Sequence, residues 1–352
     1  MIGHRGVPAS DGLGRASHEL WPEMDRYLGY PTEFTPGRID AALNEHEMES
    51  LLERRALFAD MGVRLDEIDA QTIREMVPAA TEKIVGGLIT LDGGHANPQR
   101  TVQAYAWALQ DHGGRIYQHT AVTGFRTSGG RVESVMTSRG EFGAGLVICA
   151  AGPQIPALCE TVGAYVPLAQ GRVEICVTAP IPPAWPGALA GNGLYGRQTR
   201  RGNLAYGGGP HEWIEVDMSS PDKPNTPVVR NISRRIGELF PGALDVPVIR
   251  SWAGVVELPR DHLPIIDVLE DPENLIVVSG AGAGFGRSPG TGKAVAELAM
   301  HGESSIHIDD LNLGRFGDIS RDWRMEMGWM PGREYAADYG YHPSSGHWSP
   351  AS

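Results

Sequence analysis

The sequence predicts a mixed fold of helices and strands that is built around more than one core. Three observations lead to this prediction: a length of 352 residues, apolar strand-like runs interspersed with helical patterns, and one apolar strand that runs into a glycine-rich loop and then a helix. Single hydrophobic cores stop growing beyond about 250–300 residues, so two closely packed domains are expected.

Helical patterns come first along the chain. Residues 1–30 open with a glycine-rich loop, and a helical pattern follows it. Residues 44–61 predict an amphipathic helix that stops at Gly62, and a second short helix is expected to start at Asp69.

The helix that follows residue 97 has the clearest signals. Asn97 is a favourable N-cap, Pro98 suits the first helical position, and the pair Gly113-Gly114 ends the pattern. Val102 and Leu109, with the apolar residues between them, are expected to form its buried face.

Strand signals follow. Residues 115–119, 122–127 and 131–138 predict a β-meander that leads to the apolar run 146–150. Because that run does not alternate, its strand is expected to be buried on both faces. The remaining predicted strands span 172–178, 204–208, 214–217 and 275–279, and the remaining predicted helices span 228–239 and about 290–300.

Composition and charge exclude several classes of protein. A formal net charge of −13 argues against nucleic acid or an anionic membrane as a partner, because phosphate binding needs clustered Lys and Arg. No run approaches the ~18 apolar residues of a membrane span. Three cysteines, Cys149, Cys159 and Cys176, form neither a disulfide framework nor a metal-site spacing. A reducing cytoplasm is the expected location, and no metal site is expected.

The glycine-rich loop at residues 280–286 has the layout that binds phosphate or a dinucleotide. It does not fit the P-loop pattern, because Arg287 and Ala294 occupy positions that need Gly and Ser or Thr. It does not fit the dinucleotide fingerprint either, because Phe285 or Arg287 falls where the third glycine belongs. Two interpretations remain: close packing of helix on strand, or a flat ligand pressed against bare backbone.

Four motifs in order carry a family resemblance. They are Asp-Gly-Gly-His-Ala-Asn-Pro at 92–98, Val-Ile-Cys-Ala-Ala-Gly at 147–152, Ser-Trp-Ala-Gly at 251–254 with Asp-His-Leu-Pro at 261–264, and Pro-Gly-Thr-Gly at 289–292. Over residues 15–317 this order resembles the FAD-dependent oxidoreductases of the D-amino-acid oxidase superfamily, which includes glycine oxidase, sarcosine oxidase and dimethylglycine dehydrogenase.

The resemblance implies two interleaved domains of mixed α+β and α/β character. Residues 1–30, 95–165 and 245–317 are expected to form a Rossmann-like FAD-binding domain. Residues 31–94 and 166–244 are expected to form a substrate domain built on an antiparallel sheet. Residues 318–352 are a C-terminal tail, whose segment 334–343 resembles the junction into a further domain of dimethylglycine dehydrogenase-like proteins.

The sequence also departs from the family pattern. Relatives begin with a strand, a GxGxxG turn and a helix, and no such unit precedes residue 30, so some 40–60 residues are expected to be missing by comparison with a usual βαβ unit. A late start codon, a split or degraded gene, or a fragment would each account for this, and the chain alone is expected to bind FAD weakly or not at all. Val256 stands where glycine oxidase-like proteins place a carboxylate-binding Arg, and Gly280 and Ala283 replace histidines that relatives often carry. No cysteine near Trp252 matches the one that holds covalent flavin, so the FAD is expected to be non-covalent.

The implied reaction is oxidation of a C–N bond in a secondary amine or amino acid, such as sarcosine, dimethylglycine or a D-amino acid, by hydride transfer to flavin. The implied partner is that small molecule. The alternatives are a non-catalytic remnant, or one subunit of a split enzyme whose partner chain supplies the dinucleotide segment.

Site residues are nominated by the resemblance. Arg197 is the candidate anchor for a substrate carboxylate, with a surface arginine as the alternative, and Tyr195 shares its face because residues i and i+2 of a strand do. Arg250 and His211 are weaker candidates. The expected flavin contacts are Val122, Ala151, Gly152, Gly282, Ala283, Gly284 and Phe285.

Overall fold

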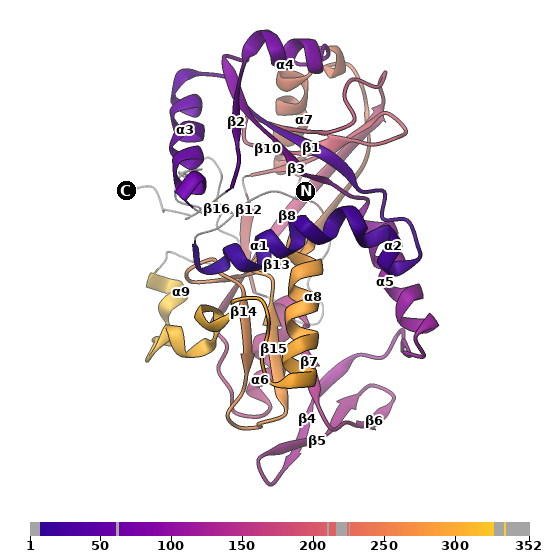
Figure 1. The fold of residues 1–352 in the computed structure, drawn as a ribbon, viewed down its shortest axis with the longest axis vertical. Coiled ribbons are helices and arrows are strands. Elements are labelled where there is room, and N and C mark those ends of the chain that lie inside the picture. The colour runs from indigo at the N-terminus through magenta and orange to yellow at the C-terminus, as the bar shows by residue number, and fades with distance from the viewer. Residues whose placement is uncertain are drawn as a thin grey trace.

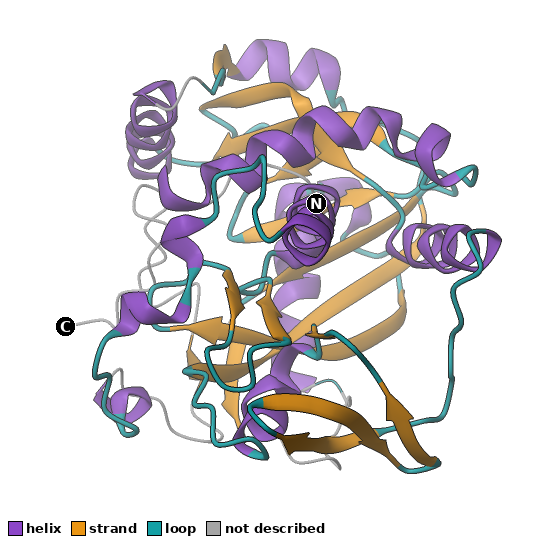
Figure 2. Cartoon of the chain, turned by 60° about the horizontal axis from the view of Figure 1, so that its bottom comes forward, coloured by secondary structure: helices purple, strands orange, loops and turns teal. Residues whose placement is uncertain are grey.

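Helices and strands are interleaved through the whole molecule, as the mixed fold predicts (Figure 2). The computed structural model describes residues 8–60, 63–209, 211–215, 224, 226–326 and 334–335. The helices are α1 (Pro8–Leu20), α2 (Met24–Leu28), α3 (Glu45–Asp60), α4 (Ala70–Met76), α5 (Pro98–Asp111), α6 (Ile155–Glu160), α7 (Thr226–Leu239), α8 (Gly284–His301) and α9 (Trp323–Glu326). The strands are β1 (Thr35–Ala42), β2 (Asp66–Asp69), β3 (Gly86–His95), β4 (Val122–Ser128), β5 (Arg131–Thr137), β6 (Gly140–Gly143), β7 (Val147–Cys149), β8 (Leu168–Pro180), β9 (Ala188–Ala190), β10 (Leu194–Gln198), β11 (Asn203–Gly208), β12 (His211–Ile214), β13 (Val248–Pro259), β14 (Ile265–Val268), β15 (Leu275–Ser279) and β16 (Glu334–Tyr335).

The strands form four sheets. One has the order β2-β3-β1-β9, a second the order β14-β15-β7, and a third the order β4-β5-β6. The fourth, here called the long sheet, has the order β10-β11-β8-β12-β16, and β13 pairs with β8 along its other edge. In Figure 1 the β1–β3 sheet with α3, α4 and α7 lies in the upper half, while α8 and the β7–β15 sheet lie in the lower half. Of the helices described, none is both long and apolar enough to cross a bilayer.

The main core lies between the β1–β3 sheet, the long sheet and α7. Ile39 from β1, Cys176 from β8 and Ile232 from α7 have no exposed surface. Tyr206 is buried with them, and its hydroxyl donates to the Leu189 carbonyl at 2.8 Å, which satisfies the one polar group that its burial would leave unpaired. This core covers one face of the long sheet and leaves the other face free for a site.

Helix α5 confirms its predicted N-terminus but not its predicted buried face. The Asn97 side chain accepts hydrogen bonds from the backbone N–H groups of Gln99 and Arg100 at 3.2 and 3.3 Å. Val102 and Leu109 are instead 66% and 49% exposed, and the buried positions are those of small residues, among them Ala104. The prediction was wrong because α5 packs closely against α2, and small side chains permit that approach.

Two strand predictions are also corrected. Residues 115–119 are not a strand, and Ile116 and Tyr117 are exposed, because β4 pairs with β5 alone and leaves no strand for them to join. The run at 146–150 contains β7, but β7 is the edge of its sheet and Ile148 is 46% exposed, so it is not buried on both faces. The strand expected at 214–217 is β12, which starts three residues earlier, and residues 216–217 lie outside the described part.

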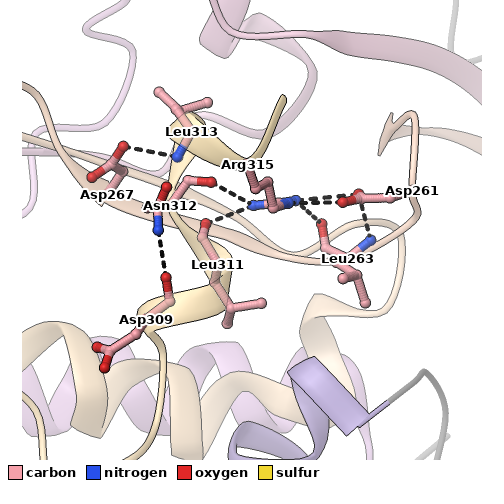
Figure 3. A network of polar contacts seen from close by, with 8 residues as sticks. All are labelled: Asp261, Leu263, Asp267, Asp309, Leu311, Asn312, Leu313 and Arg315. Atoms are coloured by element: carbon pink, nitrogen blue, oxygen red, sulfur yellow. Dashed lines mark hydrogen bonds and ion pairs between the residues drawn. The ribbon is translucent and has the colours of Figure 1, made fainter. Parts of the chain in front are cut away.

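A charged network ties the segment after α8 to the loop before β14. Figure 3 shows the Arg315 guanidinium between the Asp261 carboxylate and backbone carbonyls of residues 311 and 312. Its Nε donates to Asp261 Oδ2 at 2.7 Å and its Nη2 to Oδ1 at 3.2 Å. The Asp261 carboxylate also accepts from the Leu263 N–H at 3.1 Å. The first residue of the 261–264 motif is therefore joined to a residue that lies more than fifty positions further along the chain.

Candidate active site

The face of the long sheet that points away from the main core carries the polar candidates. Strand pairing aligns Tyr195 with Gly207, Ile175 and Trp252 in one row across β10, β11, β8 and β13. The next row, two residues along, aligns Arg197 with Ala205, Val177 and Arg250. Cross-strand neighbours and residues two apart share a face, so both rows lie on one surface, called the open face below. Tyr195 and Arg197 are therefore brought together, as the i and i+2 spacing predicts.

Burial distinguishes the two faces. The intervening residues Cys176, Leu204 and Tyr206 are at most 1% exposed, whereas Trp252 on the open face is 39% exposed. Burial lowers the pKa of Arg197, the Glu33 carboxylate opposes this shift, and the neighbouring Arg200 adds to it. Arg197 is thus partly desolvated, and an anion beside it would be held more strongly than in water.

Beside the open face lies the glycine loop, which we define as residues 280–283 between β15 and α8. Ala281 and Gly282 both have positive φ, +49° and +68°. A β-carbon placed on Gly280 would lie 2.5 Å from the Gly284 Cα, so that position requires glycine. A β-carbon on Gly282 would lie 3.1 Å from Leu258 Cδ2 and 4.0 Å from Val256 Cβ, both on β13. The loop therefore adjoins the end of the strand that carries Trp252 and Arg250.

Glu257 links the loop to the end of β7. Its Oε1 accepts from the Gly280 N–H at 3.0 Å and from the Ser279 hydroxyl at 3.2 Å. Its Oε2 lies 3.7 Å from where a β-carbon of Gly152 would be, and Gly152 has φ +58°. Ala151 and Gly152 therefore lie on one side of the Glu257 carboxylate, and the glycine loop lies on the other side. Nothing in the sequence pattern singled out Glu257, because its role depends on strand pairing.

Two other expected flavin contacts lie elsewhere. Val122 lines a cavity of about 650 Å³ with Pro153, Tyr165 and Arg321, among others, and no residue of the glycine loop lines that cavity. Phe285, in the first turn of α8, packs against the ring of Trp21 with centroids 5.4 Å apart. Ala283 precedes α8 as its N-cap, and Gly284 opens the helix without a side-chain cap.

The weaker candidate His211 lies in β12, in the part of that strand that pairs with β16.

His95 was not among the candidates, although it belongs to the 92–98 motif. Its ring is 4% exposed, and Nε2 lies 2.8 Å from the Pro186 carbonyl. Nδ1 has no hydrogen-bond partner among the described residues. Burial lowers the pKa of His95 to about 4, the Pro186 contact opposes this, and Arg197 lowers it further. The imidazole is neutral at pH 7 and lies within electrostatic reach of Arg197.

A parallel strand pair in which β15 runs into a glycine loop and the helix α8 is typical of folds that bind nucleotides. The chain belongs to the FAD dependent oxidoreductase (DAO) family, whose model matches residues 3–298. It is 28% identical over 319 residues to sarcosine oxidase subunit beta from Rhodobacter capsulatus, covering 87% of this chain and 75% of that protein.

Solved structures share the fold. Glycine oxidase from Geobacillus kaustophilus superposes with a TM-score of 0.80 at 22% identity, covering 89% of this chain and 85% of that one. L-proline dehydrogenase from P. horikoshii superposes with a TM-score of 0.78 at 20% identity, covering 94% and 88%. The predicted family, the mixed two-part fold and the FAD dependence are thereby confirmed.

The residues present fit a flavin along the glycine loop. A β-carbon on Gly254 or Gly284 would meet no atom within 4 Å, so neither glycine is demanded by packing, and both leave room for a flat ring. The N-terminus of α8 lacks a side-chain cap and offers free N–H donors to an electron-rich group. The Glu257 carboxylate could accept a hydrogen bond from a hydroxyl of a bound ligand and would repel a phosphate.

Proposed function

We propose that this protein oxidises the C–N bond of a secondary amine or amino acid and that Arg197 anchors a carboxylate of the substrate. One observation carries the proposal: the open face sets Arg197 and Tyr195 on the same surface as Trp252, and β13 leads from Trp252 to the glycine loop. A carboxylate held at one end and a flavin at the other would fix the amine between them. Positioning of this kind supplies much of the rate enhancement in hydride transfer.

The chain's own residues have separable tasks in this mechanism. FAD, when bound, accepts the hydride from the carbon next to nitrogen. Arg197 would bind the carboxylate in a bidentate manner, which orients the C–H bond. Tyr195 and Trp252 would line two sides of the substrate. Gly207 accommodates the side chains beside it, because a β-carbon there would lie 2.5 Å from Ile175 Cδ1 and 2.8 Å from Tyr195 Cζ. The neutral amine that the reaction requires would be favoured by the neighbouring cationic guanidinium.

The finer choices made from the sequence remain proposals. They are the flavin contacts, the division into domains, non-covalent attachment of FAD, and a cytoplasmic location, which the three unpaired cysteines support. β13 pairs with β8 along nearly its whole length, which assigns residues 248–259 to the long sheet. A partner chain is a further proposal. Its support is the relative named as a subunit, together with apolar side chains of Val102, Leu109 and Ile148 that are exposed in this chain.

The test is steady-state kinetics of the flavin-loaded protein with amines and amino acids and an artificial electron acceptor. Arg197→Ala should raise KM for carboxylate-bearing amines by about 30- to 1000-fold, which corresponds to the ~2–4 kcal/mol lost when one partner of a buried charged pair is removed. Arg197→Lys should recover part of the loss, since an ammonium cannot reproduce the guanidinium fork. Flavin content and melting temperature should stay unchanged.

Arg201→Ala is the matched control, because Arg201 lies on the exposed turn between β10 and β11. Unchanged kinetics for Arg197→Ala on every accepted amine would remove Arg197 from the site. Absence of oxidation with all amines and amino acids would contradict the proposed function and favour the non-catalytic alternative.

A further inference from the structure

We infer that Glu33 is a specificity-determining residue of the proposed active site, and that its negative charge, held near Arg197, makes the site reject ligands with a second carboxylate. The inference rests on the proposed function and deepens it, because it assigns the residue that sets the charge around the bound carboxylate. Glu33 lies just before β1 and belongs to none of the sequence motifs described above.

Strand pairing fixes the position of Glu33. Thr35 lies opposite His95 in the antiparallel pair of β1 and β3. Two positions outward from this pair, Glu33 lies beside Asn97, whose side-chain amide donates to Glu33 Oε2 at 2.9 Å. Arg100 Nε lies 3.8 Å from Oε1. The backbone of Glu33 has φ +57°, a left-handed conformation that is costly outside glycine and persists where the surroundings hold it. The carboxylate is therefore held in place by the end of β3 and the start of α5.

The end of β10 that carries Arg197 lies at the same corner of the molecule. Residues 184–186 make the connection. The Ala184 N–H donates to the side chain of Gln198, the residue after Arg197, at 2.9 Å. Two residues further on, the Pro186 carbonyl lies 2.8 Å from His95 Nε2. The anchor is thereby brought to the ends of β1 and β3, from which it is distant in the chain.

The electrostatics of Arg197 agree with this placement. Burial lowers the pKa of Arg197, and the Glu33 carboxylate opposes that shift, so its field reaches the guanidinium. Among the residues that the structure describes, none forms an ion pair or a side-chain hydrogen bond with Arg197, which leaves its donors to a ligand. Glu33 is thus a resident negative charge that lies near the anchor without occupying it.

Other charges near this corner offset Glu33 only in part. The Arg100 side chain is 52% exposed, whereas that of Glu33 is 26% exposed. Arg200 and Arg250 are exposed as well. Water and salt screen exposed charges more strongly than half-buried ones. His95 adds no charge at pH 7, because burial lowers its pKa to about 4.

A charge balance follows for the occupied site. A carboxylate bound to Arg197 neutralises the guanidinium, and the charge of Glu33 is then left uncompensated. A second carboxylate on the ligand would be repelled by Glu33, and in partly desolvated surroundings this repulsion is stronger than in water. An amine nitrogen, neutral or protonated, meets no such repulsion. A fixed like charge of this kind gives specificity by rejecting the wrong ligand.

The test compares two ligands without an oxidisable amine by isothermal titration of the flavin-loaded protein. Methoxyacetate has one carboxylate, and oxydiacetate has two. Wild-type protein should bind methoxyacetate more tightly. Glu33→Gln should shift the ratio of the two dissociation constants by at least ten-fold toward oxydiacetate, which corresponds to ~1.4 kcal/mol. The Gln side chain removes the charge and keeps an acceptor for the Asn97 amide.

Two further variants control for charge and for structure. Glu33→Asp keeps the negative charge and should keep most of the wild-type preference. Glu23→Gln removes an exposed carboxylate that pairs with Arg26 at 2.8 Å, and it should change neither dissociation constant.

The outcomes separate this inference from the proposed function. Equal affinity of the wild type for the two ligands, or a wild-type ratio in Glu33→Gln, would overturn the role of Glu33. If Glu33 served only to hold Arg197 in place, Glu33→Gln would weaken both ligands by the same factor, and the inference would be wrong. The proposed function is tested independently by the oxidation of sarcosine and by the dependence of its KM on Arg197.

Discussion

At the scale of single residues, burial decides which side chains carry a charge near the site. The His95 imidazole is enclosed beside β1 and the Pro186 carbonyl, and its pKa falls to about 4, so it stays neutral under ordinary conditions. Burial likewise raises the pKa of the Cys176 thiol to about 11, with a contribution from Glu174. Both groups are uncharged at pH 7, and the guanidinium of Arg197 is one of the charges that remain on the open face.

His95 gives a prediction about acid stability. Its folded-state pKa of about 4 lies below the unfolded value of 6.5, so the unfolded chain binds the proton first as pH falls. The stability that His95 contributes is complete above pH ~6.5 and is lost between pH ~6.5 and ~4, up to ~3 kcal/mol by linkage. Denaturant unfolding of wild type and His95→Gln across this range measures it. As pH falls, the free energy of unfolding of the wild type should decrease relative to that of the variant. A difference that stays constant with pH would show that His95 has the same pKa in the folded and the unfolded chain.

At the scale of elements, short polar contacts hold segments that carry few apolar residues. The segment after α8 has little regular structure, and the Arg315 guanidinium fixes it to the loop that leads into β14. Arg315 also donates to the Leu263 carbonyl at 3.1 Å and to the Leu311 carbonyl at 2.7 Å, so one side chain satisfies several backbone groups. Removing it would leave those carbonyls and the Asp261 carboxylate without their donor.

We therefore expect Arg315→Lys to lower the free energy of unfolding by ~2–3 kcal/mol, because an ammonium cannot span carboxylate and carbonyls together. Asp261→Asn should lower the free energy of unfolding by less than Arg315→Lys does, because the amide oxygen still accepts from the Leu263 N–H. Denaturant unfolding measures both. Arg321→Lys is the control, because Arg321 forms an exposed pair with Glu160 at 3.3 Å and should change stability by less than ~1 kcal/mol. Equal effects of the two lysine variants would contradict the role of the network.

At the scale of the whole molecule, β8 and β13 bring the site together. β13 pairs with β8 inside the long sheet, and its far end reaches the glycine loop beside β15 and β7. The site therefore lies where an antiparallel sheet meets a parallel strand pair, and its flavin part and its substrate part are positioned by one strand. The cysteines are buried in hydrophobic clusters: Cys176 belongs to the main core, and Cys149 and Cys159 belong to another cluster.

This arrangement predicts that FAD is held without a covalent bond. All three cysteines are buried. Cys176 is one strand position from the row of Trp252, so its side chain lies on the opposite face of the long sheet from the open face. Acid precipitation of the flavin-loaded protein should release the flavin into the supernatant. Flavin that stays in the pellet after denaturation, and that comigrates with the polypeptide in a denaturing gel, would refute the prediction.

Local signals in the sequence predicted the elements better than their environments. Asn97 and Asp69 cap their helices as expected, and the apolar run before the glycine loop is β15, because capping and turn chemistry act over a few residues. The exposure of Val102 and Ile148 was not predictable in this way, since the partner of a helix face or a strand edge comes from distant sequence.

The sequence by itself determined the family, the glycine loop, and the shared face of Tyr195 and Arg197, since strand periodicity places residues i and i+2 together whatever their neighbours are. Only the tertiary structure decided that Arg250 joins the row of Arg197, that Glu257 bridges the ends of β7 and β15, and that His95 is a neutral buried imidazole. These facts depend on strand order and register across more than fifty residues of chain. Register is selected by which face of each strand can be buried, and that choice is made by the whole core rather than by any local pattern.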